Sequence, residues 1–276
     1  MHMITNPPSR DHAEVDLGPA AGVSDKGLRH HRNEDAMALA ATQAPDGPAV
    51  VAVACDGVSS SARPDEASQS AAQAAQPVLV SAVQAGGDLA AASLAAVAAA
   101  RRALADLQGP GGDTSATTFV SAVALGHEVT LCWLGDSRVY WLTQPPAESR
   151  LLTRDDSVAG GMVEAGLADE AAAMASPHAH VLTRWLDGDA ADLAEDPERA
   201  AHVERYTPPG SGALLLCTDG LWNYLPEAPD LAALALPKAL TDPLGAAADM
   251  VSFAVDAGGA DNITAVIIPY HTPAPS

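Results

Sequence analysis

The chain is poor in basic residues. Its 276 residues include 14 Lys and Arg against 35 Asp and Glu, which gives a formal net charge of −21. Binding to a nucleic-acid backbone rests on clustered Lys and Arg, so this composition argues against a nucleic-acid partner. The acidity favours solubility and would attract metal cations, but it says little about the fold.

Long apolar runs are missing as well. No stretch reaches the roughly 18 apolar residues of a transmembrane helix, and residues 1–8 contain no apolar core of a signal peptide. We therefore expect no membrane partner. Only three cysteines occur, Cys55, Cys132 and Cys217, each inside an apolar run. An odd number in such settings indicates reduced thiols of the core, and hence a cytoplasmic protein.

The length of the chain allows one large domain or two small ones with a substantial buried core. No internal repeat is visible. Polar and Pro-containing residues 1–13 predict a flexible tail. We expect a single domain over residues 14–270 and a short C-terminal tail over residues 271–276.

Apolar runs bounded by turn residues predict strands. They lie at 15–22, 35–41, 50–55, 117–125, 129–134, 139–142, 213–217 and 263–268. Ala-rich segments predict helices at 64–85 and 88–107, with a further helix at 243–257. The acidic, Ala-rich residues 154–200 predict short helices and a mobile flap. Hairpins and paired helices, without βαβ units, favour an α+β fold of antiparallel sheets covered by helices.

Four short acidic motifs are spread over the chain: Asn33-Glu34-Asp35, Asp56-Gly57, Thr218-Asp219-Gly220 and Asp261-Asn262. Three of them adjoin an apolar, strand-like run. A carboxylate at the end of a buried strand is costly to desolvate unless a cation or hydrogen bonds compensate it. Several such ends meeting at one point suggest a site for hard divalent metals. Each motif alone could also be a turn or a helix cap.

Taken in order with Gly135-Asp136-Ser137-Arg138, these motifs resemble those of the metal-dependent Ser/Thr protein phosphatases of the 2C type, over residues 15–270. The resemblance implies an αββα sandwich, in which two packed antiparallel β-sheets are flanked by helix pairs. It also implies hydrolysis of phosphoserine and phosphothreonine by a water that bridges two Mg²⁺ or Mn²⁺ ions.

The resemblance assigns the ligands of these ions. Asp56 would bridge both ions, assisted by the carbonyl of Gly57. Asp219 and Asp261 would complete the set of ligands of the first ion. Glu34 and Asp35 would hydrogen-bond waters of the second ion.

The resemblance bears on three further residues. Asp113 matches the frame of a ligand for a third ion in bacterial members, although it could also cap the end of a Gly-rich linker. Asp136 and Arg138 are expected to pair with each other at a turn, away from the metals.

One position departs from the family pattern. Members usually place an Arg four residues before the Glu to grip the substrate phosphate, and that position is His30 here, with Arg29 and Arg32 out of frame. His30 thus joins Asp56 and Glu34 as an expected catalytic residue, unless it merely faces solvent. His178 and His180 are expected to be surface residues of the flap.

The favoured hypothesis is therefore a monomeric enzyme that dephosphorylates protein substrates of Ser/Thr kinases. The alternative is a catalytically weakened, phosphatase-like module with a binding or regulatory role. The missing Arg favours this alternative, and the complete acidic set argues against it. A phosphatase of small phosphomonoesters or a stress-sensor phosphatase is a third possibility, since substrate choice would lie in the flap and the surface.

Overall fold

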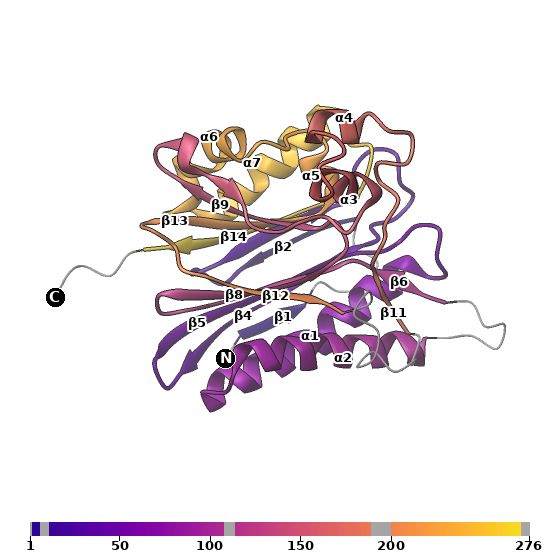
Figure 1. The fold of residues 1–276 in the computed structure, drawn as a ribbon. Coiled ribbons are helices and arrows are strands. Elements are labelled where there is room, and N and C mark those ends of the chain that lie inside the picture. Colours follow the sequence, from indigo (N-terminus) through magenta and orange to yellow (C-terminus); the bar gives the residue numbers. More distant parts are fainter. Residues whose placement is uncertain (1, 6–10, 108–113, 189–199, 272–276) are drawn as a thin grey trace.

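The structure is a computed structural model that describes residues 2–5, 11–107, 114–188 and 200–271. Two antiparallel sheets of six strands pack face to face, and pairs of helices cover the outer face of each (Figure 1). The predicted α+β fold and its αββα layering are confirmed. No helix in the described ranges has the length and apolarity needed to cross a membrane.

The first sheet has the strand order β1-β4-β5-β7-β8-β12 and is covered by α1 and α2. The bounds of these elements are β1 His2–Thr5, β4 Asp35–Ala44, β5 Gly47–Asp56, β7 Phe119–Leu125, β8 Glu128–Leu134, β12 His202–Tyr206, α1 Pro64–Ala85 and α2 Leu89–Asp106.

The second sheet has the order β10-β9-β13-β14-β3-β2 and is covered by α6 and α7. The bounds are β10 Arg150–Leu151, β9 Arg138–Thr143, β13 Gly212–Cys217, β14 Ile263–Tyr270, β3 Ala21–Asp25, β2 His12–Asp16, α6 Ala228–Ala239 and α7 Pro243–Asp256. Smaller elements are β6 Ala116–Thr117, β11 Leu186–Asp187, a 3₁₀ turn at Pro146–Glu148, α3 Val158–Glu164, α4 Glu170–Met174 and α5 Asp219–Trp222.

Side-chain size decides what each face of a strand packs against. In β4, Ala38 and Ala40 face the Ala-rich helix α1, whereas Met37 and Leu39 point into the core between the sheets. Successive side chains of a strand point to opposite faces, so small residues on one face let the helices approach closely. The three cysteines are free and buried, as the sequence predicted for core thiols.

The N-terminal region differs from the sequence-based expectation. The predicted strand over residues 15–22 is the hairpin of β2 and β3. Its turn is closed by the Gly18 N–H, which donates to the Asp16 carboxylate at 2.8 Å, and Gly18 has a φ of +82°. Glycine adopts such a backbone without strain, and the Gly18-Pro19 pair is the turn signal that the apolar pattern concealed.

The predicted tail over residues 1–13 also differs from the structure. Residues 2–5 form β1, which pairs with β4, and His12 already belongs to β2. A sheet edge offers unpaired backbone groups to any neighbouring segment, so the pairing does not require an apolar sequence. Residues 6–10 and 272–276 lie outside the described residues, and the domain limits at 14 and 270 remain predictions.

The segment over residues 154–200 contains the short helices that its composition predicted, α3 and α4. Its mobility remains a prediction, and residues 189–199 lie outside the described part. The sequence-based interpretation missed α6 and β12. β12 carries only partly buried or exposed side chains, so it lacks the apolar run by which the other strands were recognised.

Candidate metal centre

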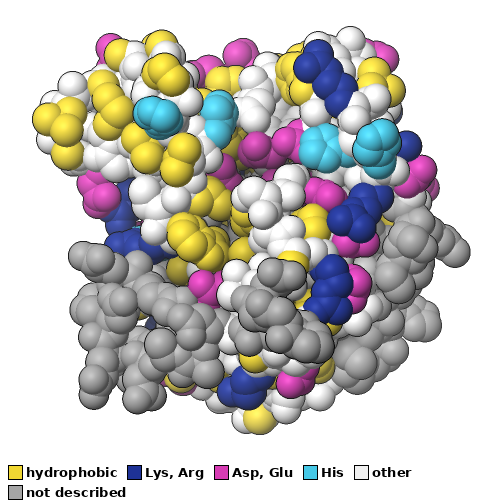
Figure 2. Space-filling view, turned by 90° about the vertical axis from the view of Figure 1, so that its right-hand side faces the viewer, with side chains coloured by type: hydrophobic (Ala, Val, Ile, Leu, Met, Phe, Trp, Pro, Cys, Tyr) yellow, Lys and Arg dark blue, Asp and Glu magenta, His cyan; other side chains and the backbone are white. Residues whose placement is uncertain are grey.

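Strand ends from both sheets meet at one edge of the sandwich. Asp35 opens β4 and lies opposite Asp56, the last residue of β5, in the antiparallel ladder. From the second sheet, Asp219 follows β13, and Asp261 precedes β14. Asp56, Asp219 and Asp261 line a cavity of about 600 Å³. Figure 2 shows acidic side chains in the middle of this face, with histidine side chains on either side.

Asp35 is the most deeply buried of these acids, with 4% of its surface exposed. Its Oδ2 accepts hydrogen bonds from the hydroxyls of Thr218 and Thr264 at 2.8 and 2.7 Å, whereas its Oδ1 is buried without a hydrogen-bond partner. Burial, with smaller contributions from Asp261 and Asp219, raises the pKa of Asp35 to about 8. This carboxylate therefore lacks a compensating charge.

Asp219 and Asp56 share this property. Asp219 Oδ2 accepts a hydrogen bond from the Asn223 amide at 3.2 Å, but its Oδ1 is buried without a donor. Burial and the charge of Asp261 raise the pKa of Asp219 to about 7. Burial raises the pKa of Asp56 well above its ordinary value, and the charges of Asp35 and Asp219 raise it further.

This donor set fits divalent cations. Buried carboxylate oxygens without donors, placed beside other carboxylates, lose their mutual repulsion when a cation binds among them. In the described part of the chain, no three His, Cys, Asp or Glu side chains are arranged to hold one ion by themselves. An ion here would therefore keep several water ligands, as Mg²⁺ commonly does.

Glu34 is buried, with 8% of its surface exposed, and is fixed by its neighbours. Its Oε2 accepts a hydrogen bond from the Ser59 hydroxyl at 2.6 Å, and its Oε1 accepts one from Arg32 Nε at 3.3 Å. The Gly57 N–H donates to the Glu34 carbonyl at 3.0 Å. A Cβ at Gly57 would lie 2.3 Å from the Pro64 carbonyl oxygen. The Asp56-Gly57 motif thus needs glycine for close packing, besides any role of its carbonyl.

His30 has a partner that the sequence did not suggest. Its Nε2 lies 3.0 Å from Asp261 Oδ1, so it touches a predicted metal ligand. Its predicted role as a phosphate clamp stays a prediction. Asp113 lies outside the described residues, although its neighbour Thr114 lines the acidic cavity.

The prediction for Asp136 and Arg138 is wrong. Asp136 lines the acidic cavity together with Asp56 and Asp219, and its pKa is raised well above the ordinary value by burial and by Asp219. Asp136 follows the apolar run that forms β8, which is the same signal that marked the other strand-end acids. This local signal could have placed Asp136 with the other strand-end acids, but the prediction instead paired it with Arg138.

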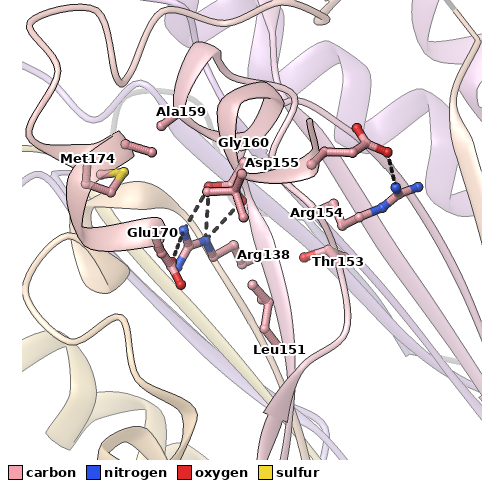
Figure 3. Close-up of a pocket in the computed structure, with 12 residues that line it drawn as sticks. Arg138, Leu151, Thr153, Arg154, Asp155, Ala159, Gly160, Glu170 and Met174 are labelled. Atoms are coloured by element: carbon pink, nitrogen blue, oxygen red, sulfur yellow. Dashed lines mark hydrogen bonds and ion pairs between the residues drawn. The ribbon is translucent and has the colours of Figure 1, made fainter. Parts of the chain in front are cut away.

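Arg138 instead binds acids from the segment that follows. It forms two parallel hydrogen bonds to Asp155, Nε to Oδ1 at 3.0 Å and Nη2 to Oδ2 at 2.8 Å, and it lies 3.4 Å from Glu170 (Figure 3). Its guanidinium carbon stacks 3.9 Å from the ring centre of Trp222. The cavity of about 190 Å³ beside this pair contains none of the predicted metal ligands.

Both flap histidines are exposed, as expected. His180 additionally lines the acidic cavity and stacks on Trp222 with ring centres 6.1 Å apart. The flap therefore reaches the mouth of the candidate centre.

Similar proteins share this architecture. The serine/threonine phosphatase stp of Listeria innocua is 32% identical over 166 residues, covering 59% of this chain and 58% of its own length. The chain thus spans less than two thirds of this relative. The structure of the Mycobacterium tuberculosis serine/threonine phosphatase PstP/Ppp is similar with a TM-score of 0.72 and 26% identity, covering 91% of this chain and 98% of that chain.

A catalytic domain of the serine/threonine protein phosphatase PstP, in complex with two manganese ions, has the same fold. Its TM-score is 0.63 at 23% identity, with 90% of this chain and 96% of that chain covered. The sequence pattern described as Protein phosphatase 2C matches residues 28–247. Since this match covers most of the chain, including the motifs that contain Glu34, Asp56 and Asp219, the protein belongs to the protein phosphatase 2C family.

Proposed function

We propose that this protein is a metal-dependent phosphatase that removes phosphate from phosphoserine and phosphothreonine in proteins. The observation that carries the proposal is the pair of buried carboxylate oxygens without donors, Asp35 Oδ1 and Asp219 Oδ1, beside a cavity with further acids. A fold that only needed rigidity would pair these oxygens internally.

The residues of the cavity suggest a division of roles. Two bound divalent ions, Mg²⁺ or Mn²⁺, would lower the pKa of a water molecule and neutralise the phosphoryl oxygens. Asp56 would contact both ions, with the Gly57 carbonyl beside it. Asp219 and Asp261 would hold one ion, and Glu34 and Asp35 would orient water around the other.

Two positions extend this assignment. Asp113 would bind a third ion, and Asp136, which lines the acidic cavity with Asp56 and Asp219, would assist. His30, in contact with Asp261, would either bind substrate phosphate or orient that carboxylate.

Substrate class and location are proposed from the relatives and the thiols. The Listeria innocua relative is named a serine/threonine phosphatase, which supports phosphorylated proteins of Ser/Thr kinases as substrates. The PstP catalytic domain, whose structure contains two manganese ions, supports the choice of cation. Free, buried cysteines are compatible with a reducing, cytoplasmic location.

The second candidate function is a phosphatase-like regulatory module without turnover. One observation favours it: a histidine engaged with Asp261 stands where the family usually has a phosphate-binding Arg. A metal-binding module would need the same carboxylates, so binding of the ion alone does not separate the two functions.

Activity and metal binding should therefore be measured together. We expect Mn²⁺ to raise the melting temperature of the protein and to switch on hydrolysis of an aryl phosphate and of a phosphothreonine peptide, with EDTA abolishing both. Stabilisation without turnover would support the regulatory module. Absence of both effects would overturn the metal centre itself.

A further inference from the structure

The loop between β3 and β4 is basic in an otherwise acidic protein. Within residues 26–32 lie Lys26, Arg29 and Arg32, three of the 14 basic residues of the chain, together with His30 and His31. The remaining surface of a protein with a net charge of −21 repels anions. This loop is therefore a local exception, and it lies directly before the motif that contains Glu34.

The basic residues surround a cavity next to the metal centre. Arg29, His30, His31, Arg32 and Glu34 line a space of about 410 Å³. Two of them touch the candidate centre, since His30 lies 3.0 Å from Asp261 and Arg32 lies 3.3 Å from Glu34. Figure 2 shows basic and histidine side chains beside the acidic middle of this face. A group bound here would sit a short distance from a phosphate at the metals.

The loop is held in place before any ligand arrives. The Asn262 side-chain amide donates to the carbonyls of both Lys26 and Arg32, at 2.8 and 3.1 Å, and so ties the two ends of the loop together. The Leu28 N–H donates to the Gly259 carbonyl at 2.8 Å. Because the loop is already ordered, less of its conformational entropy is lost when a ligand binds.

The basic side chains of the loop differ in whether they already have an acidic partner. Arg32 forms ion pairs with Glu34 and Asp65, and Lys26 forms one with Asp11. In contrast, the exposed side chains of Arg29 and His31 form no ion pair or hydrogen bond with any described residue. They are the two donors of this cavity that remain available to a ligand.

We propose that Arg29 and His31 form a subsite for a second anionic group of the substrate, a phosphoryl or carboxylate group near the phosphorylated Ser or Thr. This inference rests on the proposed function and deepens it. The preferred substrates would be acidic or multiply phosphorylated segments. An arginine binds such groups through two parallel hydrogen bonds, and His31 would add a donor.

The test compares three phosphothreonine peptides that differ only near the phosphorylated residue: neutral neighbours, Asp neighbours, or a second phosphothreonine. The variants are Arg29→Ala and, as a control with the same charge change on the exposed face of α2, Arg102→Ala. For Arg29→Ala we expect KM to rise about fivefold for the two anionic peptides, the size expected for an exposed charge pair. The neutral peptide and an aryl phosphate should change less than about twofold, and kcat should stay the same.

The two anionic peptides separate the sources of the second group. A larger effect on the doubly phosphorylated peptide assigns the subsite to phosphate, and equal effects assign it to any oxyanion. An equal rise in KM for all substrates would mean that Arg29 grips the phosphate being removed, which overturns the second subsite. A rise that Arg102→Ala reproduces, or no rise at all, would overturn it as well.

Failure of the proposed function can be recognised separately. If the wild-type protein hydrolyses none of the peptides, their binding to the Mn²⁺-loaded protein is measured by calorimetry. Tighter binding of the anionic peptides, lost in Arg29→Ala, would retain the subsite while rejecting the enzyme. Equal binding of all three peptides would reject the subsite.

Discussion

The molecule contains two buried groups of charges that lie close together but are built in opposite ways. In the candidate metal centre, Asp35 and Asp219 each keep a buried oxygen without a donor. Beside it, Arg138 is 3% exposed and Asp155 is 8% exposed, and their side chains satisfy each other through parallel hydrogen bonds. Trp222 joins the two groups, because its Nε1 donates to the Asp136 carbonyl while its ring stacks on Arg138.

The difference separates a structural role from a functional one. A buried ion pair with complete hydrogen bonding needs nothing from outside, and its loss is felt as instability. A group of buried acids without a counter-charge is unfavourable until a cation arrives, so its loss should affect binding and turnover rather than folding. The following predictions test this distinction.

The largest effect is expected for Asp56→Asn. Because Asp56 is proposed to contact both ions, the Mn²⁺-dependent turnover of the variant should fall by more than about 100-fold, a larger loss than the roughly 10- to 100-fold typical of a residue that only supports a metal ligand. Its metal-free form should be at least as stable as the wild type, since one repelling charge is gone. Phosphatase assays and thermal unfolding in EDTA measure both quantities. A variant that retains more than a tenth of wild-type turnover at saturating Mn²⁺ would contradict the bridging role.

Arg138→Met should behave in the opposite way. It leaves Asp155 buried without its partner, and we expect the free energy of unfolding to fall by about 3–5 kcal/mol. Arg154→Met is the matched control. Arg154 pairs with Glu164, and both exposed side chains line the cavity beside the Arg138–Asp155 pair. The control should change stability by less than about 1 kcal/mol. Equal urea midpoints for the two variants would show that the buried pair contributes no more than the exposed one.

The pH dependence of stability should reveal the acids of the cavity in the metal-free protein. The pKa values of Asp35 and Asp219 are raised to about 8 and about 7, above the value near 4 of an unfolded chain. The folded state then binds more protons, so these groups favour folding at pH 4, and this contribution is lost as the pH rises through 7 and 8.

Asp219→Asn should therefore become more stable relative to the wild type as the pH rises from about 5 to about 7 in EDTA, with little further change at higher pH. For one carboxyl the slope is at most roughly 1.4 kcal/mol per pH unit. Saturating Mn²⁺ should reverse the order of the two proteins at high pH. A difference in melting temperature that stays constant between pH 5 and 9 would argue against a raised pKa at Asp219.

The smallest effect is expected at His30. If it binds substrate phosphate, His30→Ala should raise KM by a few-fold without shifting the Mn²⁺ concentration needed for half-maximal activity, and His30→Arg should lower KM. The contact with Asp261 provides the competing outcome. A shifted Mn²⁺ requirement with an unchanged KM would identify His30 as a positioning residue for that carboxylate.

Local patterns in the sequence predicted most of the framework. The apolar runs marked β4, β5, β7, β8, β9, β13 and β14 within three residues at each end, and the Ala-rich segments marked α1 and α2 within one residue. These elements are recognisable because burial imposes a composition on each of them separately. The hairpin at Gly18 was missed because residues 15–22 were interpreted as one continuous strand across the Gly18-Pro19 turn, and β12 was missed because none of its side chains is fully buried.

The sequence by itself determined which carboxylates end buried strands, since an apolar run and the acid that follows it are both local features. Only the tertiary structure decided how these acids and their neighbours are paired. Arg138 selects Asp155 rather than the adjacent Asp136, and His30 meets Asp261 from the other end of the chain. Such choices depend on how two sheets and a flap pack in three dimensions, because a side chain binds the group that packing brings to it and not the nearest one in the sequence.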